Sequence, residues 1–234
     1  MPCRATYAPL KEVGIGMATK SEALHRILQT GITAVIRARS SQHLIEVAEA
    51  IRAGGVECIE VTMTTPDALR VIEEASRRFG DEVLIGVGSV LDAETARAAI
   101  LAGAQFVVGP CLDRGMIELC RRYSRPVIPG AFTPTEILTA WTAGADLVKV
   151  FPAGAVGPSY FRDVLAPLPQ VKLVPTGGVD LSTAGEFIKA GAAALCVGSA
   201  MMPQAAMANQ QWDMLTDLAG RFVAAVREAR AARG

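Results

Sequence analysis

Residues 127–151 read VIPGAFTPTEILTAWTAGADLVKVF and contain the unit from which the fold can be inferred. Apolar runs begin at Val127 and at Leu147, and a segment with helical spacing lies between them. The Thr133 side chain can cap the start of that helix, and Gly144 can end it in a left-handed conformation. A strand, a helix and a second strand in this order predict two parallel strands joined by a right-handed crossover.

The same alternation extends over most of the chain. Apolar, β-branched runs recur about every 20–26 residues, and each is followed by a segment with helical periodicity. The runs are ITAVIRA from Ile32, CIEVTM from Cys58, VLIGVGSV from Val83, FVVGP from Phe106, VIPGAF from Val127, LVKVFPA from Leu147, VKLVPTGGV from Val171 and ALCVGSAM from Ala194. Eight strands that alternate with eight helices predict the α/β class and a (β/α)8 TIM barrel. An open doubly wound sheet is the alternative, but no G-x-G-x-x-G fingerprint follows the first strand.

The predicted barrel forms a single domain. A length of 234 residues is typical of a single α/β barrel, and no linker or second domain is apparent, so we expect one domain over 1–234. An extra N-terminal helix over 21–29 is expected to cover the bottom of the barrel. One long helix over about 204–231 is expected to follow the last strand.

Composition excludes several classes of protein. Lys plus Arg (23) equals Asp plus Glu (23), which argues against a nucleic-acid binder. No apolar stretch reaches 18 residues and the N-terminus has no apolar signal region, so neither membrane insertion nor secretion is expected. The five cysteines are dispersed without C-x-x-C spacing, which is typical of reduced thiols in a cytoplasmic protein.

Three charged residues interrupt the apolar runs: Arg37, Glu60 and Lys149. A charge in a buried parallel strand is costly unless it is paired or faces a cavity. Because the active site of a barrel lies at the carboxyl ends of the strands, we expect these three side chains to converge there, with Ser89 beside them. The alternative is a buried network that only satisfies its own charges, and such networks often add little stability.

Lys149 is the strongest candidate for a catalytic residue among the five lysines. Its apolar neighbours Val148, Val150 and Phe151 exclude water, which favours a neutral amine. A neutral amine can attack a ketone and form an iminium, the electron sink for carbon–carbon cleavage. Lys172 is the rival, but it begins its strand and is expected at the opposite, solvated end of the barrel.

The last two strands end in PTGGV (175–179) and VGSAM (197–201). Phosphate often binds between these two loops in barrels, on backbone N–H groups. Gly177, Gly178 and Gly198 allow close approach of the backbone, and Ser199 adds a hydroxyl group. No carboxylate cluster suggests a metal, so neither a metal nor a cofactor is expected. His25 and His43 fall on predicted helices and are expected to lie away from the catalytic end.

Several of these motifs together resemble one enzyme family. GGVECIEVTMTTP, IGVGSV, IPGAFTPTE, VKVFPAG and LVPTGGV occur in order between about residues 21 and 202. They resemble the 2-keto-3-deoxy-6-phosphogluconate (KDPG) aldolases and their 2-keto-4-hydroxyglutarate (KHG) aldolase relatives. The resemblance implies a class I, Schiff-base aldolase: a metal-independent lyase built as a TIM barrel and usually a homotrimer. Residues 1–16 are an N-terminal extension outside the resemblance.

The resemblance also implies roles for individual residues. Lys149 matches the lysine that forms the iminium, and Glu60 matches the general acid and base. Ser89 stands where relatives usually carry a threonine that helps to hold the keto-acid carboxylate. The residues that match the walls of the pocket and its phosphate end are Pro110, Phe151, Thr176, Gly177, Gly178, Gly198 and Ser199.

One position departs from part of the family. Some relatives carry an arginine for the substrate carboxylate where this chain has Thr64, and Thr64 is itself expected among the substrate-binding residues. Other relatives carry the arginine on the first strand, where this chain has Arg37. An arginine can bind a carboxylate through two hydrogen bonds, so Arg37 is expected to take this role.

The resemblance implies cleavage of KDPG to pyruvate and glyceraldehyde 3-phosphate, with 4-hydroxy-2-oxoglutarate as a second substrate. The expected partner is thus a small keto-acid sugar phosphate, in carbohydrate metabolism of the Entner–Doudoroff type. Three alternatives stay open: a 2-keto-3-deoxy-6-phosphogalactonate aldolase, a thiamin phosphate synthase-like enzyme or epimerase, and a non-catalytic sugar-phosphate-binding barrel.

Overall fold

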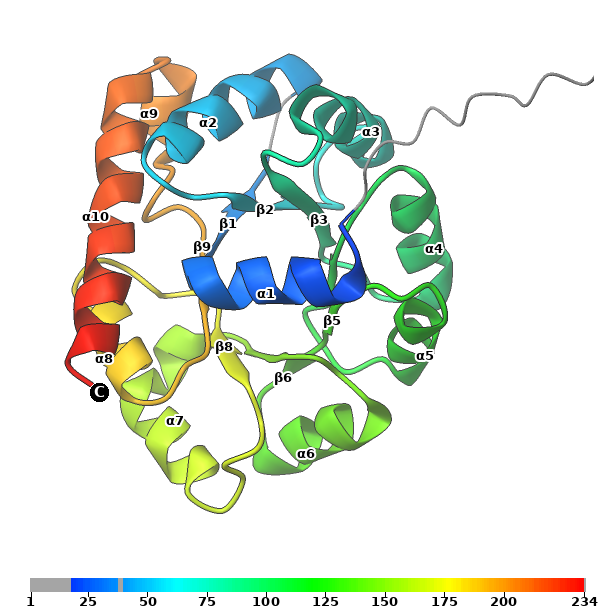
Figure 1. The fold of residues 1–234 in the computed structure, drawn as a ribbon, viewed down its shortest axis with the longest axis vertical. Coiled ribbons are helices and arrows are strands. Elements are labelled where there is room, and N and C mark those ends of the chain that lie inside the picture. Colours follow the sequence, from blue (N-terminus) through cyan, green and yellow to red (C-terminus); the bar gives the residue numbers. More distant parts are fainter. Residues whose placement is uncertain (1–17, 38–39, 234) are drawn as a thin grey trace, which may run out of the picture.

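Parallel strands form the centre of the structure and helices form a ring around them, as Figure 1 shows for the computed structural model. The structure describes residues 18–37 and 40–233, so the expected extension over 1–16 lies outside the described residues. The strands are β1 (Ile32–Ile36), β2 (Cys58–Thr62), β3 (Leu84–Gly88), β4 (Val107–Val108), β5 (Val127–Ile128), β6 (Gly130–Ala131), β7 (Val148–Val150), β8 (Leu173–Pro175) and β9 (Leu195–Val197). The helices are α1 (Lys20–Thr30), α2 (Ser41–Ala53), α3 (Ala68–Phe79), α4 (Ala93–Leu101), α5 (Arg114–Arg122), α6 (Pro134–Ala143), α7 (Gly157–Leu165), α8 (Ala184–Lys189), α9 (Gln204–Ala208) and α10 (Trp212–Ala231).

The strands close into the predicted barrel. One sheet has the order β5-β4-β3-β2-β1-β9 and the other has the order β6-β7-β8, with every pair parallel. β5 and β6 are two parts of one predicted strand, which is interrupted at Pro129 because proline has no N–H to donate. A parallel bridge between Thr176 and Cys196 joins the last two strands, and the Ala193 N–H donates to the Leu173 carbonyl at 2.9 Å.

The predicted caps at the two ends of the helix between β6 and β7, Thr133 and Gly144, are confirmed at α6. The Thr133 hydroxyl accepts from the Glu136 N–H, and the Glu136 carboxylate accepts from the Thr133 N–H, which completes a capping box. Gly144 ends α6 with a φ of 99°, in the left-handed region.

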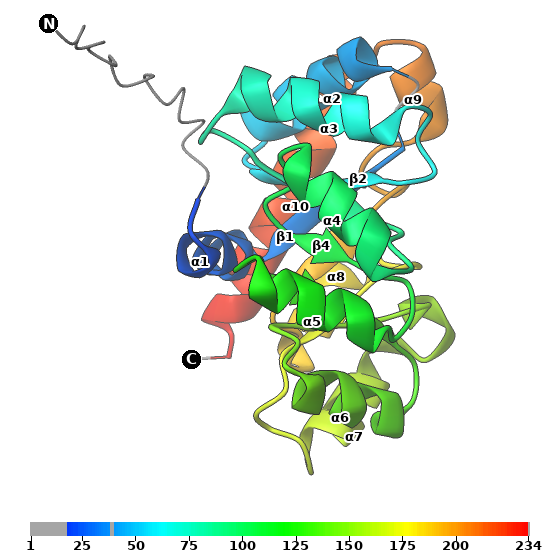
Figure 2. The ribbon, with the colours of Figure 1, turned by 90° about the vertical axis from the view of Figure 1, so that its right-hand side faces the viewer.

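Helix α1 covers one end of the barrel, as expected for the extra N-terminal helix. Figure 1 shows α1 across the ring of strands, and Figure 2 shows that it lies on one side of the molecule. Its buried residues Ala23 and Ile27 pack on side chains inside the barrel. These side chains are Cys58, Leu84, Phe106, Val108, Ile128, Leu147, Val174, Ala194 and Cys196. Because this end is filled by apolar groups, a site for a polar ligand must lie at the other end.

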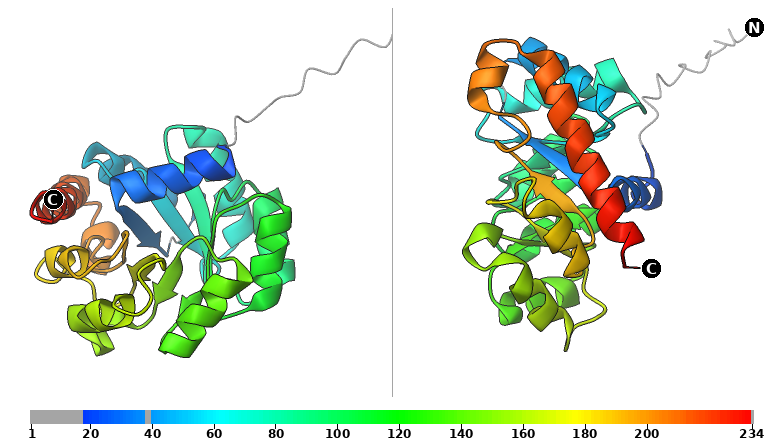
Figure 3. Two further views of the ribbon diagram at one scale, coloured as in Figure 1. Left: turned by 60° about the horizontal axis from the view of Figure 1, so that its bottom comes forward. Right: turned by 90° about the vertical axis from the view of Figure 1, so that its left-hand side faces the viewer.

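The C-terminal helix α10 holds α1 in place. The Arg230 guanidinium donates to the carbonyls of Leu28 and Gln29, both at 2.7 Å, and so binds the last turn of α1. Figure 3 shows the end of α10 beside α1. Among the described residues no helix is long and apolar enough to cross a membrane.

The prediction of one helix over 204–231 is wrong. The segment forms α9 and α10, which are separated by residues 209–211. Gln210 has a φ of 53°, and a right-handed helix cannot continue through a left-handed residue. The break leaves α9 at the catalytic end of the barrel while α10 packs on α2 and α8.

We expect Ile27→Ala to lower the free energy of unfolding by about 2–5 kcal/mol, because it opens a cavity beneath the barrel. Urea denaturation followed by circular dichroism measures this loss. His25→Ala, on the exposed side of the same helix, is the control and should change stability by less than about 0.5 kcal/mol. Equal effects of the two substitutions would show that α1 does not cover the core.

Candidate active site

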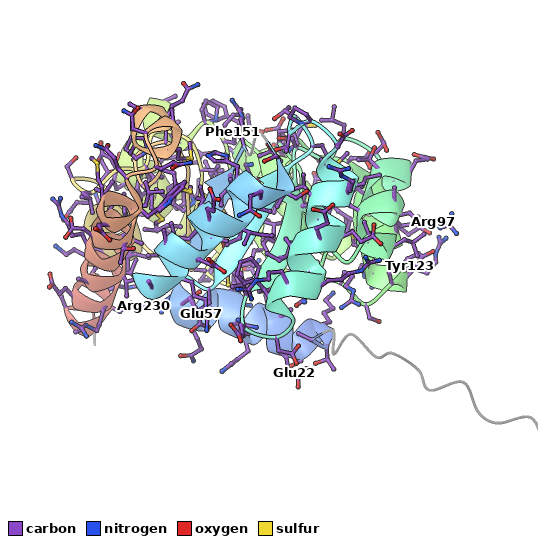
Figure 4. All side chains as sticks on the ribbon, turned by 90° about the horizontal axis from the view of Figure 1, so that it is seen from above. Glu22, Glu57, Arg97, Tyr123, Phe151 and Arg230 are labelled. Carbon is purple, nitrogen blue, oxygen red and sulfur yellow. The ribbon has the colours of Figure 1, made fainter. Side chains whose placement is uncertain are left out.

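A cavity of about 460 Å³ opens at the carboxyl ends of the strands, opposite α1. In Figure 4, Phe151, which lines the cavity, lies at the edge of the molecule opposite Glu22 and Glu57. Of the predicted site residues, the cavity is lined by Arg37, Glu60, Ser89, Pro110, Lys149, Phe151, Thr176, Gly177, Gly178, Gly198 and Ser199. The predicted convergence of Arg37, Glu60 and Lys149 is therefore confirmed.

Glu60 is the most deeply buried acid in this cavity, with 1% of its surface exposed. It is the middle residue of β2, and its Oε2 atom has no hydrogen-bond partner in the described part of the chain. Burial raises the pKa of the Glu60 carboxyl above its usual value, and the positive charge of Lys149 opposes this only in part. Glu60 is thus suited to hold and release a proton.

Lys149 is the middle residue of β7 and is 5% exposed. Its backbone is fixed in the ladder, where its N–H donates to the Pro129 carbonyl at 2.9 Å. Its Nζ atom lies 5.2 Å from the centre of the Phe151 ring, a cation–π contact. No direct ion pair joins Lys149 to Glu60 in the described regions, so both groups are available to a bound molecule.

Arg37 differs from the other two charged residues because it is exposed at the end of β1. It forms no ion pair with any residue in 18–37 or 40–233, so its guanidinium can bind an anionic ligand. The alternative of a buried network that satisfies its own charges does not describe these side chains.

The loops that follow β3 and β8 have unusual backbone conformations at the cavity. Ser89 has a φ of 59°, which is uncommon for a residue with a side chain. Gly177 and Gly178 both have a φ of 78°, and a Cβ atom on Gly178 would lie 2.7 Å from the Cα atom of Gly154. Glycine at 178 therefore lets the two loops meet, with the Gly154 N–H donating to the Gly177 carbonyl at 2.8 Å.

Thr64 does not line this cavity. It lies in a neighbouring cavity of about 510 Å³ that shares Val35, Arg37, Gly198 and Ser199 with the first. Its hydroxyl is 2.9 Å from that of Thr62, which does line the first cavity. Of Arg37 and Thr64, only Arg37 therefore lines the first cavity.

The expectation that His43 lies away from the catalytic end is wrong. His43 lies in the first turn of α2, which begins just after β1 ends, and it lines the neighbouring cavity. Helical periodicity alone could not show this, because it gives no information about the end of the barrel at which a helix begins. Its ring centre lies 6.4 Å from that of Trp212, at the start of α10.

Cys196 and Asp180 also line the cavity of about 460 Å³, although neither is among the predicted site residues. Cys196 is also a core residue, and burial raises the pKa of its thiol to about 12. Strand alternation could have placed Cys196 at the cavity, since it lies two residues before Gly198. Lys172 is exposed as predicted, with its Nζ atom 5.3 Å from the centre of the Trp141 ring.

The chain is similar to known aldolases over most of its length. A family model described as KDPG and KHG aldolase matches residues 24–218. The 2-dehydro-3-deoxy-phosphogluconate aldolase of Treponema pallidum is 35% identical over 86% of this chain and 95% of its own. The 2-dehydro-3-deoxy-6-phosphogalactonate aldolase of Escherichia coli is 31% identical over 85% of this chain and 95% of its own. The structure of a KDPG aldolase of Legionella pneumophila with pyruvate captured as a covalent carbinolamine superposes with a TM-score of 0.79, at 30% identity, and covers 85% of this chain and 96% of that one.

The raised pKa of Glu60 predicts a pH dependence of stability. Between the ordinary glutamate pKa of about 4.3 and the raised native pKa, the folded protein holds a proton that the unfolded chain has lost. The free energy of unfolding therefore loses this contribution as pH rises through that window. Glu60→Gln removes the ionisation, so its stability relative to the parent should increase with pH in urea denaturation at pH 4.5, 6 and 8. Exposed Glu94→Gln should show no such trend, and a flat difference for Glu60→Gln would contradict the prediction.

Proposed function

Because the chain belongs to the KDPG and KHG aldolase family, we propose that it is a class I aldolase that cleaves KDPG to pyruvate and glyceraldehyde 3-phosphate. The observation that carries this proposal is the pair of buried residues Lys149 and Glu60, which line one cavity without a direct ion pair. A non-catalytic sugar-phosphate-binding barrel, or a phosphate-binding barrel of the thiamin phosphate synthase type, has no need of such a pair.

In the proposed reaction, the Lys149 amine attacks the C2 carbonyl carbon of the substrate and forms a carbinolamine. Loss of water gives an iminium, which accepts the electron pair of the C3–C4 bond as that bond breaks. Glyceraldehyde 3-phosphate leaves, and the enamine that stays on Lys149 is protonated at C3. Hydrolysis of the resulting iminium releases pyruvate and restores the amine.

Glu60 moves the protons in this sequence. Its carboxyl can protonate the carbinolamine hydroxyl as water leaves, and its carboxylate can accept the proton of the C4 hydroxyl as the C3–C4 bond breaks. A general acid and base works best when its pKa lies near the working pH, and burial shifts Glu60 in that direction.

The remaining residues of the cavity orient the substrate. Arg37 and Ser89 bind the carboxylate of the keto acid, while Pro110 and Phe151 form the walls. The phosphate end lies at the loops after β8 and β9, where the members of the site are Thr176, Gly177, Gly178, Gly198 and Ser199. Two anchored ends fix the C3–C4 bond beside Lys149.

The proposal extends to 4-hydroxy-2-oxoglutarate, which would give pyruvate and glyoxylate. The galactonate epimer of KDPG is the alternative substrate, since the chain is similar to aldolases named for each sugar acid. We further propose a homotrimer in the cytoplasm that serves an Entner–Doudoroff type of route. Free thiols at Cys58, Cys111, Cys120 and Cys196 are consistent with a reducing compartment.

Pyruvate release from a panel of keto acids tests the function. The phosphorylated gluconate should be cleaved fastest, and the unphosphorylated acid should be cleaved at least about tenfold less efficiently, since one anchor worth about 1.4 kcal/mol is lost. Lys149→Met should abolish release from every substrate, whereas Lys172→Met, at the opposite end, should retain it. Pyruvate release by Lys149→Met, or no release by the parent chain, would contradict the proposal. Faster cleavage of the phosphorylated galactonate than of the gluconate would favour the alternative substrate.

The role of Arg37 is tested by moving the arginine. Arg37→Ala should lower kcat/KM by about 10–100-fold, mainly through KM, because a charge-assisted contact worth about 1.5–3 kcal/mol is lost. Thr64→Arg added to this variant supplies a guanidinium from the neighbouring cavity and should restore part of the loss. Steady-state kinetics measure both effects. Arg37→Ala with an unchanged KM would show that Arg37 does not bind the carboxylate.

A further inference from the structure

The carboxylate of Glu60 occupies the place where residue 88 would have a side chain. An ideal Cβ atom on Gly88 would lie 1.7 Å from Oε1, 2.4 Å from Cδ and 2.6 Å from Cγ of Glu60. All three distances are far below van der Waals contact. Any side chain at position 88 would therefore have to displace Glu60, or be displaced by it.

This overlap follows from the pairing of β2 and β3. Glu60 pairs with Gly86, and Thr62 pairs with Gly88. Because strand residues alternate between faces, Gly86 and Gly88 face the barrel interior on the same side as Glu60. Gly88 lies one layer closer to the cavity than Glu60, so the Glu60 side chain leans past it toward the ligand.

The two glycines of β3 leave space for two different side chains. A Cβ atom on Gly86 would lie 2.4 Å from the ring of Phe106, which belongs to the apolar end of the barrel. Gly86 thus makes room for the core, whereas Gly88 makes room for a carboxylate of the catalytic cavity.

Backbone conformation does not explain the glycine at position 88. Gly88 is the last residue of β3 and is not one of the glycines with positive φ. Glycine weakens a strand, since it adds conformational entropy to the unfolded chain and has no side chain to pack. The space that it leaves is therefore its structural contribution.

Hydrogen bonding does not fix the Glu60 carboxylate either. Its Oε2 atom is buried and has no partner among the described residues. Contact with the backbone of Gly88 restrains the carboxylate sterically and leaves its oxygens free to exchange protons. A carboxylate anchored by several N–H donors would be held in its ionised form.

We propose that Gly88 is a positioning residue, whose missing side chain forms the slot that holds the Glu60 carboxylate in the catalytic cavity. The inference rests on the proposed function, because it assigns Gly88 to the proton-transfer step of that reaction. Gly88 contacts Glu60 and acts only through it.

The first test compares Gly88→Ala with two other glycine-to-alanine variants. Gly88→Ala should lower kcat by about 10²–10⁴-fold, the usual contribution of a general acid–base group, with KM changed by less than about threefold. It should also remove the limb of the kcat–pH profile that reports Glu60. Gly86→Ala crowds Phe106 instead, so it should lower the melting temperature but keep the parent pH profile. Gly185→Ala, whose Cβ atom meets only ordinary contacts at 3.8 and 4.0 Å, should change neither.

The second test uses stability and does not depend on activity. Gly88→Ala should lower the urea midpoint in the parent chain but have little effect in a Glu60→Ala background, where the space is empty. If Gly88→Ala alone does not fold, the double variant should fold. An equal decrease of the urea midpoint in both backgrounds would overturn the inference. A kcat and pH profile of Gly88→Ala equal to those of the parent chain would overturn it as well. A parent chain that releases no pyruvate would instead refute the proposed function, while the stability comparison would still test the slot.

Discussion

Burying an ionisable group raises the free energy of the folded protein, and this constraint separates the apolar end of the barrel from the end that contains the charged residues. An ionised side chain inside a protein is unfavourable unless it is paired or solvated. At the end covered by α1 the interior holds apolar side chains such as Leu84 and Phe106. At the other end Glu60 and Lys149 are buried at the edge of a cavity. The apolar packing below them compensates for their unfavourable burial. In the proposed reaction, this burial makes the two groups chemically reactive.

The strands around this pair contain glycine where a side chain of the pair or a neighbouring loop needs space. Gly88 leaves room for the Glu60 carboxylate, and Gly130 pairs with Lys149 in the ladder between β6 and β7. A Cβ atom on Gly130 would lie 2.2 Å from the backbone of Pro110, so glycine there lets the loop after β4 approach the cavity. The site is therefore made by small residues on neighbouring strands as much as by the large polar ones.

Much of this arrangement could be predicted from the sequence, since strand alternation and apolar runs are local signals. They located the eight strands, the helix over the bottom and the cavity that contains Glu60 and Lys149. The break at Gln210 falls inside a helical pattern at a position that no glycine or proline marks. His43 could have been placed at the carboxyl ends of the strands, because the helix that contains it begins just after the first strand. From the sequence alone, Gly88 could be a turn residue or a strand residue. Its role as space for the Glu60 carboxylate becomes visible only when β2 and β3 are paired.

Reductive trapping with pyruvate shows whether the buried Lys149 amine forms a covalent bond with a keto acid. The protein is incubated with pyruvate and sodium borohydride, digested and mapped by mass spectrometry. We expect one reduced pyruvate on Lys149, none on Lys172 and none in the Lys149→Met variant. No adduct in a folded protein, or an adduct on another lysine, would refute the role of Lys149.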